Sequence, residues 1–260
     1  MKFTISSRFS QYPSIFLTII ISLLLVWNSA KSWLAYIDAD DPPPDGFKEA
    51  IAIDDSNAQF YFLLSQYYNN YDMSFPRDQV YNLYMKALEL NPFNYNYWYY
   101  LAEFLSGEGK RDKALFALNQ ATELSPGVVE LRWRAGMLAA KLVDENALLD
   151  NLSSVIANDR NRRLKAFIIL WQSIRNGNKI QHVIPNNALP AYLHYLISTH
   201  RVSEAEIIWN RMLNNVEIPR DIFLRYVTFL INEHDIASAK KAWVHQFGDW
   251  RGVWNGNFED

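Results

Sequence analysis

The chain begins with one long apolar segment and continues as a series of shorter amphipathic ones. Residues 15–27 contain only two polar side chains, Thr18 and Ser22, and a second apolar stretch occupies residues 32–37. From Asp45 to Phe247, apolar residues recur every three or four positions, and turn-forming residues interrupt them about every 12–18 positions. This period is that of amphipathic α-helices. We therefore predict an all-α protein with an N-terminal transmembrane helix.

The apolar segment is long enough to cross a membrane only when it is taken as a whole. The run 15–27 is too short, because a hydrocarbon core of about 30 Å needs about 20 helical residues. Residues 13–37 are sufficient, with Lys31 near one end. Three aromatic side chains suit the membrane interfaces: Trp27, Trp33 and Tyr36. We expect a cytoplasmic tip and anchor over residues 1–40, with membrane attachment through residues 13–37.

A cleaved signal peptide is the alternative interpretation of this segment, since it would have the same basic start and apolar middle. Its cut site needs small residues at positions −3 and −1. A cut after Ala30 places Asn28 at −3, and a cut after Ala35 places Trp33 there. Neither residue is small, so we favour an uncleaved anchor.

The charges around the segment predict its orientation. Lys2 and Arg8 precede it, and four aspartates follow it between residues 38 and 45. The positive-inside bias therefore predicts a cytoplasmic N-terminus and an extracytoplasmic body. The whole chain carries −3 and residues 1–31 carry +3, which leaves −6 on residues 32–260. This acidic body has no Lys/Arg-rich block and no cysteine, so we expect neither a nucleic-acid partner nor disulfides or cysteine-ligated metals.

The clearest repeating unit runs from Tyr95 to the turn at residues 125–127. Counting Tyr95 as position 1, distinctive residues occupy positions 4, 7, 8, 11, 20, 24, 27 and 32: Trp98, Leu101, Ala102, Leu105, Ala114, Leu118, Ala121 and Pro126. This spacing resembles the tetratricopeptide repeat, a helix–turn–helix unit of about 34 residues. The resemblance implies an α-solenoid in which small residues let helices approach and large residues, Trp98 among them, fill the core.

Neighbouring segments follow the same pattern less completely. Upstream, positions 4, 7, 8 and 11 are matched by Tyr61, Leu64, Ser65 and Tyr68. In the C-terminal half, the two members of each of four pairs stand one full repeat apart: Tyr192/Tyr226, Leu196/Leu230, Ala205/Ala239 and Trp209/Trp243. We predict degenerate repeats there, with helices over 188–199, 202–214, 219–232 and 235–247.

These patterns also predict the domain organisation. The prolines of a linker at 41–46 should hold the chain extended, with Asp45 capping a lone helix over 45–54 that docks on the first full repeat. Repeats over 47–160 come next, followed by an irregular segment over 161–187. In that segment we expect a helix at 162–175, and then a loop to Pro190 that separates two sub-arrays. Degenerate repeats over 188–247 complete the array.

The helical pattern stops after Phe247. The sequence Val-Trp-Asn-Gly-Asn-Phe-Glu-Asp at 253–260 resembles the opening strand of jelly-roll carbohydrate-binding-like domains. The alternative is an aromatic tail at 248–260 that docks on the last helix. If the jelly-roll resemblance holds, the chain is truncated, because a single strand cannot bury a core.

Residues suited to catalysis or metal binding do not form recognisable motifs. The five histidines include no HExxH arrangement, and no serine lies in a GxSxG motif. Residues 107–110, Gly-Glu-Gly-Lys, lie where the turn between two helices is expected, so we interpret them as that turn. We therefore expect no catalytic residues, no cofactor and no metal, and we predict that the protein is not an enzyme.

By the resemblance, positions 2, 5, 9 and 12 of each repeat face the concave groove where ligands bind. These positions hold Gln59, Phe62, Gln66 and Asn69, then Asn96, Tyr99, Glu103 and Ser106, then Glu130, Trp133 and Met137. The rings of Phe62, Tyr99 and Trp133 would hold an extended peptide or helix, or stack on sugars. The alternative is that these rings pack between successive first helices.

The resemblance implies a membrane-anchored extracytoplasmic scaffold or adaptor that binds proteins through its groove. Combined with the anchor, it points to the bacterial inner membrane and to cell-envelope work such as exopolysaccharide assembly. One alternative is a glycan-binding protein in which the solenoid is a spacer for a C-terminal jelly-roll domain. Two further alternatives are a glycan-active enzyme whose catalytic part lies beyond this chain, and a receptor array that faces the cytoplasm.

Overall fold

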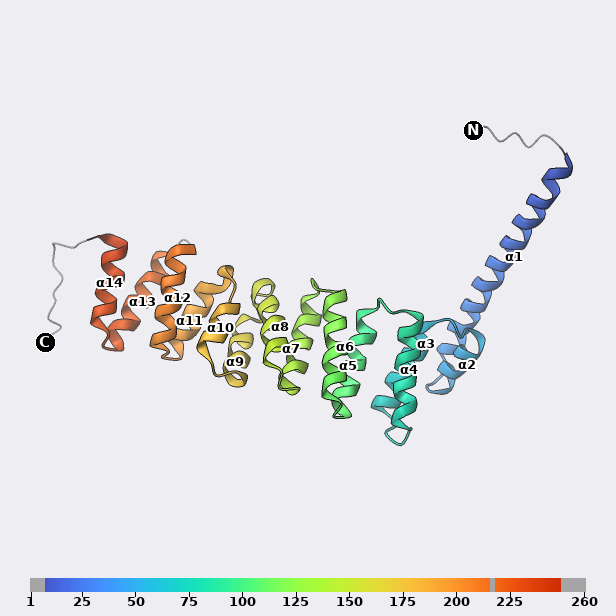
Figure 1. Cartoon of the computed structure of the whole chain (residues 1–260), viewed down its shortest axis with the longest axis horizontal. Helices are drawn as coiled ribbons and strands as arrows, with labels where there is room; N and C mark the ends of the chain where they lie inside the picture. The colour runs from blue at the N-terminus through green and yellow to red at the C-terminus, as the bar shows by residue number, and fades with distance from the viewer. Residues whose placement is uncertain (1–7, 216–217, 249–260) are drawn as a thin grey trace. The chain divides into compact units, whose positions relative to one another are not determined.

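The computed structural model describes residues 8–215 and 218–248. The described residues are helical almost throughout and contain no strand (Figure 1). One long N-terminal helix is followed by helical hairpins, which confirms the predicted all-α solenoid. The tail at 249–260, where we considered a jelly-roll strand, lies outside the described residues.

The N-terminal helix α1 (Arg8–Ala39) joins the two apolar runs of the sequence without interruption. Its portion Pro13–Ala39 has 27 residues and contains an 18-residue stretch with a mean hydropathy of 1.8, so it is long and apolar enough to cross a membrane. The large apolar side chains between Ile15 and Val26 are 38–66% exposed, so no other described part of the protein covers them.

The proline-rich segment after α1 is a tight turn, and our expectation of an extended linker was wrong. Helix α2 (Asp45–Ile53) folds back onto the end of α1. A Cβ atom at Gly46 would lie 2.5 Å and 2.6 Å from the carbonyl oxygens of Asp41 and Asp38, so this close approach requires glycine. Asp45 does not cap α2 either, because the N-cap is Pro44 and Asp45 pairs with Lys48 in the first turn.

The first compact unit ends at Leu124 and contains two hairpins beyond α2. They are α3 (Ala58–Asn70) with α4 (Arg77–Leu90), and α5 (Tyr95–Gly107) with α6 (Arg111–Leu124). Helix α2 packs against both α1 and α3, where Ala35, Ala50 and Phe60 form a buried cluster. The lone helix predicted at 45–54 therefore has a partner, because the end of α1 pairs with it.

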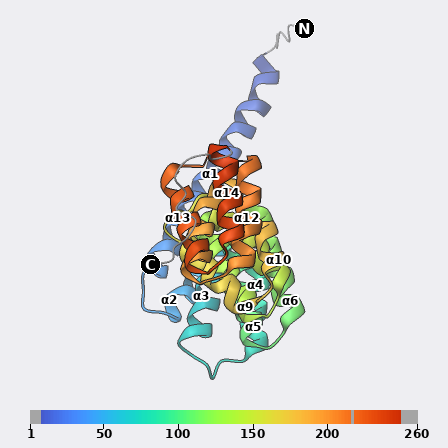
Figure 2. The ribbon, with the colours of Figure 1, turned by 90° about the vertical axis from the view of Figure 1, so that its left-hand side faces the viewer.

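The second compact unit begins at Ser125, whereas the sequence suggested a break within 161–187. Its helices lie side by side (Figures 1 and 2). They are α7 (Val129–Lys141), α8 (Glu145–Asn158), α9 (Arg163–Ser173), α10 (Gly177–Val183), α11 (Leu189–Ser198), α12 (Val202–Asn215), α13 (Arg220–Asn232) and α14 (Ile236–Phe247). The last four agree with the predicted helices to within about two residues, the usual uncertainty of a helix boundary.

The loop that we predicted between residue 176 and Pro190 contains a short helix, α10, and a 3₁₀ turn at Asn186–Ala188. The side chain of Asn176 caps α10 by accepting from the backbone N–H of Lys179. Ile180 and Ile184 are buried, so the segment is anchored by two apolar side chains. Two turns of helix are too few to show a clear helical period in the sequence.

The turns inside four hairpins share one backbone geometry. One residue in each has a positive φ: 70° at Gly109, 55° at Val143, 55° at His200 and 62° at His234. The next backbone N–H donates to a carbonyl five residues back, at distances of 2.8–3.0 Å. This is the Schellman C-cap. Since positions 109 and 143, and also 200 and 234, stand one full repeat apart, the turns recur with the period of the sequence, and the turn predicted at 107–110 is confirmed.

Candidate functional site

Repeat position 4 makes the same contact in three successive repeats with three different side chains. The hydroxyl of Tyr61, the indole N–H of Trp98 and the guanidinium Nε of Arg132 each donate to a carbonyl six residues earlier, at 3.2, 2.7 and 3.3 Å. We expected Trp98 in the core, but it is partly exposed. Its indole N–H must reach the carbonyl of Pro92, which keeps the ring at the edge of the hairpin, against Phe116.

Of the aromatic residues predicted to face the groove, Phe62 packs between the first helices of successive repeats, and Tyr99 is buried. The ring of Phe62 on α3 is half-buried and stacks on Tyr97 of α5, with 4.6 Å between centroids. Tyr99 is only 3% exposed, and its hydroxyl donates to Glu103 at 2.7 Å. Little of the Tyr99 side chain is therefore open to a ligand in this structure, and its role in binding stays a prediction.

Most polar residues predicted for the first groove are engaged within the repeats. Gln66 Nε2 donates to the hydroxyl of Tyr84 at 2.6 Å, and Asn69 Oδ1 accepts from Arg77 Nη2 at 2.8 Å. Both contacts join α3 to α4. Asn96 is partly exposed, and its backbone N–H donates to the side-chain Oδ1 of Asn94 at 3.0 Å. Ligand binding by these residues stays a prediction, and Gln59 is the exposed one among them.

The third predicted set gathers on one face of α7. Glu130, Trp133 and Met137 follow one another at intervals of three and four residues, and all three remain at least partly exposed. Arg162, from the turn before α9, pairs with Glu130 at 2.7 Å and lies over the ring of Trp133 at 5.3 Å. A ligand that stacks on this face of Trp133 must first displace the guanidinium.

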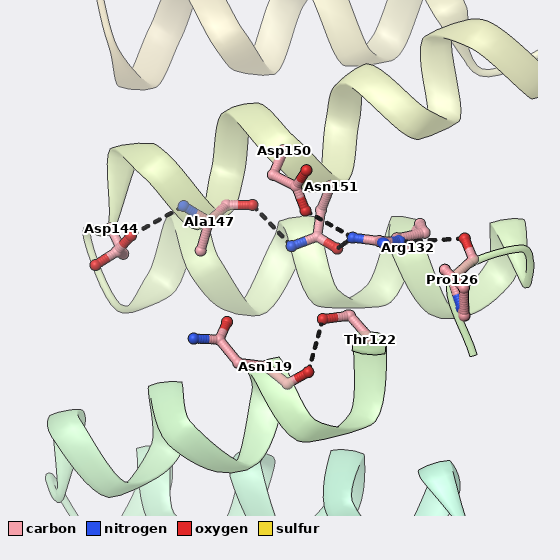
Figure 3. Close-up of polar contacts among 8 residues, drawn as sticks. All are labelled: Asn119, Thr122, Pro126, Arg132, Asp144, Ala147, Asp150 and Asn151. Carbon is pink, nitrogen blue, oxygen red and sulfur yellow. Dashed lines mark hydrogen bonds and ion pairs between the residues drawn. The ribbon is translucent and has the colours of Figure 1, made fainter. Parts of the chain in front are cut away.

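A polar cluster joins α7 to α8 within their hairpin (Figure 3). Arg132 Nη1 donates to Asp150 Oδ2 at 2.7 Å and to Asn151 Oδ1 at 3.2 Å. Asn151 is 2% exposed, and its amide nitrogen donates to the carbonyl of Ala147 at 2.7 Å. Since both ends of this buried amide find a partner, we assign the cluster to hairpin packing rather than to ligand binding.

A cavity lies between α11 and α13, among residues for which the sequence predicted no binding role. Its volume is about 300 Å³, and it is lined by Pro190, Ala191, Leu193, His194, Ile197, Asp221, Ile222 and Arg225. When Tyr192 and Tyr226 are counted as position 7, the residues Pro190, His194, Ile197 and Asp221 hold positions 5, 9, 12 and 2. Extending the count to the degenerate repeats would have found them.

The junction between α1 and the hairpins is a second polar centre. Asp54 is 4% exposed and accepts from the hydroxyls of Ser32 at 3.0 Å and Ser56 at 2.6 Å. Lys31 Nζ lies 3.7 Å from Asp54 and 3.6 Å from Asp55. Burial by itself would raise the pKa of the Asp54 carboxyl, but the hydrogen bonds from Ser56 and Ser32 and the charge of Lys31 outweigh burial and lower it.

Residues 83–116 match the tetratricopeptide repeat family model. The matched segment begins within α4, includes all of α5 and ends within α6. The comparison with curated proteins found no match. Within the described chain, no three His, Asp or Glu side chains are placed to share a metal ion.

Several solved structures resemble this chain at low identity. A tetratricopeptide repeat protein from Parabacteroides merdae is 14% identical, with 79% of this chain and 86% of that chain covered and a TM-score of 0.43. Pseudomonas aeruginosa PilF is 13% identical, with 79% and 83% covered and a TM-score of 0.37. The Naa15/Naa10 complex bound to HypK gives 13% identity and a TM-score of 0.46, and the match covers 79% of this chain and 34% of that chain. Values this low tell us nothing about partners.

Proposed function

We propose that this chain is a membrane-anchored scaffold that binds a protein partner through the first helices of its repeats. The cavity between α11 and α13 carries the proposal. Four of its eight lining residues occupy the positions that face the ligand groove in tetratricopeptide repeats, and the cavity is within the range of about 300–1,000 Å³ usual for ligand sites. Helical arrays of this kind bind partners through extended surfaces.

The lining of this cavity suits one apolar side chain of a bound peptide or helix. Pro190, Leu193, Ile197 and Ile222 supply apolar surface, and His194, Asp221 and Arg225 supply polar groups around it. An apolar anchor surrounded by polar contacts is the usual anatomy of a protein interface. We therefore infer that the partner presents a large apolar residue flanked by charged ones.

In this proposal, the apolar N-terminal segment holds the scaffold in a membrane. Residues 13–30 form about 27 Å of helix, close to a hydrocarbon core of about 30 Å, with Lys31 at the boundary. The packing of Ala35 against Ala50 supports an uncleaved anchor, since a cut after Ala35 would remove that contact. We place the protein in the bacterial inner membrane with its repeats outside the cytoplasm. There it would concentrate partners for envelope work such as exopolysaccharide assembly.

A photo-crosslinking experiment tests the groove. A photoreactive residue at position 194 of the full chain should crosslink a partner in membranes, and one at position 240, on the exposed face of α14, should not. Ala191→Trp fills the cavity and should remove the crosslink. The matched control Ala237→Trp adds the same bulk at an exposed site of α14 and should leave the crosslink from position 194 unchanged. If Ala191→Trp leaves the crosslinked product intact, the cavity is not the binding site.

A further inference from the structure

A second cavity lies in the first unit, away from the predicted groove positions. It has a volume of about 420 Å³ and is bordered by α2, α3 and α4. Its α3 residues are Tyr61, Leu64 and Tyr68, which hold repeat positions 4, 7 and 11 rather than 2, 5, 9 and 12. This cavity therefore needs an explanation separate from the groove between first helices.

The floor of the cavity is apolar. Leu64 and Tyr68 are 5% and 4% exposed, and the ring of Phe75 stacks on Tyr68 with the two planes inclined by 8°. Leu83 of α4 completes this surface. An apolar floor of this size favours a ligand with a large aliphatic or aromatic group.

The charged residues of the rim are both cationic. Lys48 and Lys86 line the cavity and no carboxylate does, although the chain as a whole is acidic. Each lysine pairs with an acidic neighbour three residues away, Asp45 or Glu89, and those carboxylates are 78% and 68% exposed. Such exposed ion pairs stabilise the protein by at most about 1 kcal/mol. The carboxylate of a ligand can therefore replace Asp45 or Glu89 beside its lysine at little cost in free energy.

Two amide side chains also line the cavity with the lysines and are available to hydrogen-bond a ligand. Gln79 and Asn82 line the cavity from α4, and neither side-chain amide has a hydrogen-bond partner in the part of the chain that the structure describes. With Lys86 they follow one another at intervals of three and four residues, which places them along one face of the helix. A side-chain amide offers both a donor and an acceptor, as a peptide group does.

We propose that this cavity binds an acidic peptide segment of a partner protein. The segment places one large apolar side chain on the floor and its carboxylates beside Lys48 and Lys86. Its backbone pairs with the amides of Gln79 and Asn82. An anionic lipid headgroup would satisfy the lysines but would leave the row of amides unused, so the peptide accounts for more of the site. The site is distinct from the groove between α11 and α13 and does not depend on it.

Fluorescence anisotropy on the full chain in detergent micelles tests this proposal. The probe is a labelled peptide, Gly-Asp-Phe-Glu-Asp-Gly, and its neutral counterpart is Gly-Asn-Phe-Gln-Asn-Gly. We expect the acidic peptide to bind about tenfold more tightly than the neutral one, and Lys48→Glu with Lys86→Glu to weaken it about tenfold or more. The control pair Lys113→Glu with Lys240→Glu makes the same change in net charge at exposed sites elsewhere and should have less than about a twofold effect.

Two further measurements decide between occupants. Asn82→Trp covers the cavity from an exposed position and should abolish peptide binding, with the helical circular dichroism signal unchanged. Ala191→Trp, in the other unit, should not affect it. Equal binding of the two peptides, or no response to the lysine substitutions, overturns the proposal. It is also overturned if water-soluble dihexanoylphosphatidylglycerol binds with the same lysine dependence and the acidic peptide does not bind.

Discussion

The turns inside the hairpins accept residues that do not favour the left-handed backbone conformation found there. The left-handed position of the helix–helix turn is occupied by glycine at Gly109 but by a β-branched residue at Val143. In the left-handed region, the Cβ of an L-residue is crowded by the backbone, at a cost of about 1–2 kcal/mol. Val143 is 81% exposed, so its side chain gains little from burial in return. The turn is therefore fixed by its capping hydrogen bonds and not by the preference of valine.

Val143→Gly should stabilise the second unit. We expect an increase of about 1 kcal/mol in the free energy of unfolding, because glycine adopts this conformation without steric cost. Thermal unfolding of the full chain in detergent, followed by circular dichroism, measures the change. Gly109→Val is the reciprocal control and should lower stability by a similar amount. If Val143→Gly lowers the melting temperature, the turn is not strained.

The arrangement of α1, α2 and α3 shows that the anchor helix and the first repeat are one packed assembly. The ring of Tyr36 meets Phe60 edge-on at 5.2 Å, and Ala35 is fully buried beside Ala50. Asp54, at the end of α2, connects to α1 through Ser32 and Lys31. The last turns of α1 therefore serve as the first helix of a hairpin with α2, and the solenoid starts directly at the proposed membrane boundary.

This junction should be sensitive to acid. The folded-state pKa of Asp54 is lowered from its usual value of 3.8, so the carboxylate stabilises the folded state at higher pH. That contribution is complete above about pH 5 and is lost as the pH falls below 3.8 through the lowered pKa. Hydrogen exchange of the α2 amides, corrected for the intrinsic effect of pH, should show protection that decreases over this range.

Asp54→Asn provides the control for that prediction. It removes the charge but keeps the size of the side chain, so α2 should be less protected at pH 7 and should lose the acid-dependent step. An unchanged step in the Asp54→Asn variant would show that another group controls the junction.

For the molecule as a whole, orientation in the membrane is the property with the largest functional consequence. The basic residues before the apolar segment, Lys2 and Arg8, lead us to propose that the repeats are extracytoplasmic. The chain has no native cysteine, so single cysteines report position without background.

Cysteine labelling in intact bacterial cells tests this topology. Met73→Cys, at a site that is 79% exposed in the turn between α3 and α4, should react with a membrane-impermeant maleimide that reaches the periplasm. Thr4→Cys, before the apolar segment, should react only after lysis. The reverse pattern would place the repeats in the cytoplasm, and loss of the Thr4→Cys label from the mature protein would show that the segment is cleaved.

The positions of the helices and the repeat period could be predicted from the amino-acid pattern because both depend on short-range spacing. Helices α11 to α14 were located from apolar residues three and four positions apart, and the period of the repeat reappears in the turns. Helix α10 escaped prediction because it is short and is anchored by only two apolar residues, Ile180 and Ile184.

The accessibility of the predicted binding residues depended on neighbours that are distant in sequence. Tyr99 fits a groove position, yet it is buried in the folded chain. The cavity between α11 and α13 exists because two helices that belong to successive repeats leave space between them. Ala35, near the end of α1, belongs by sequence to the predicted membrane segment, but in the folded chain it is buried together with Ala50 and Phe60. Hydrophobic periodicity is a local property of the chain, whereas burial and cavities arise from contacts between segments that folding brings together.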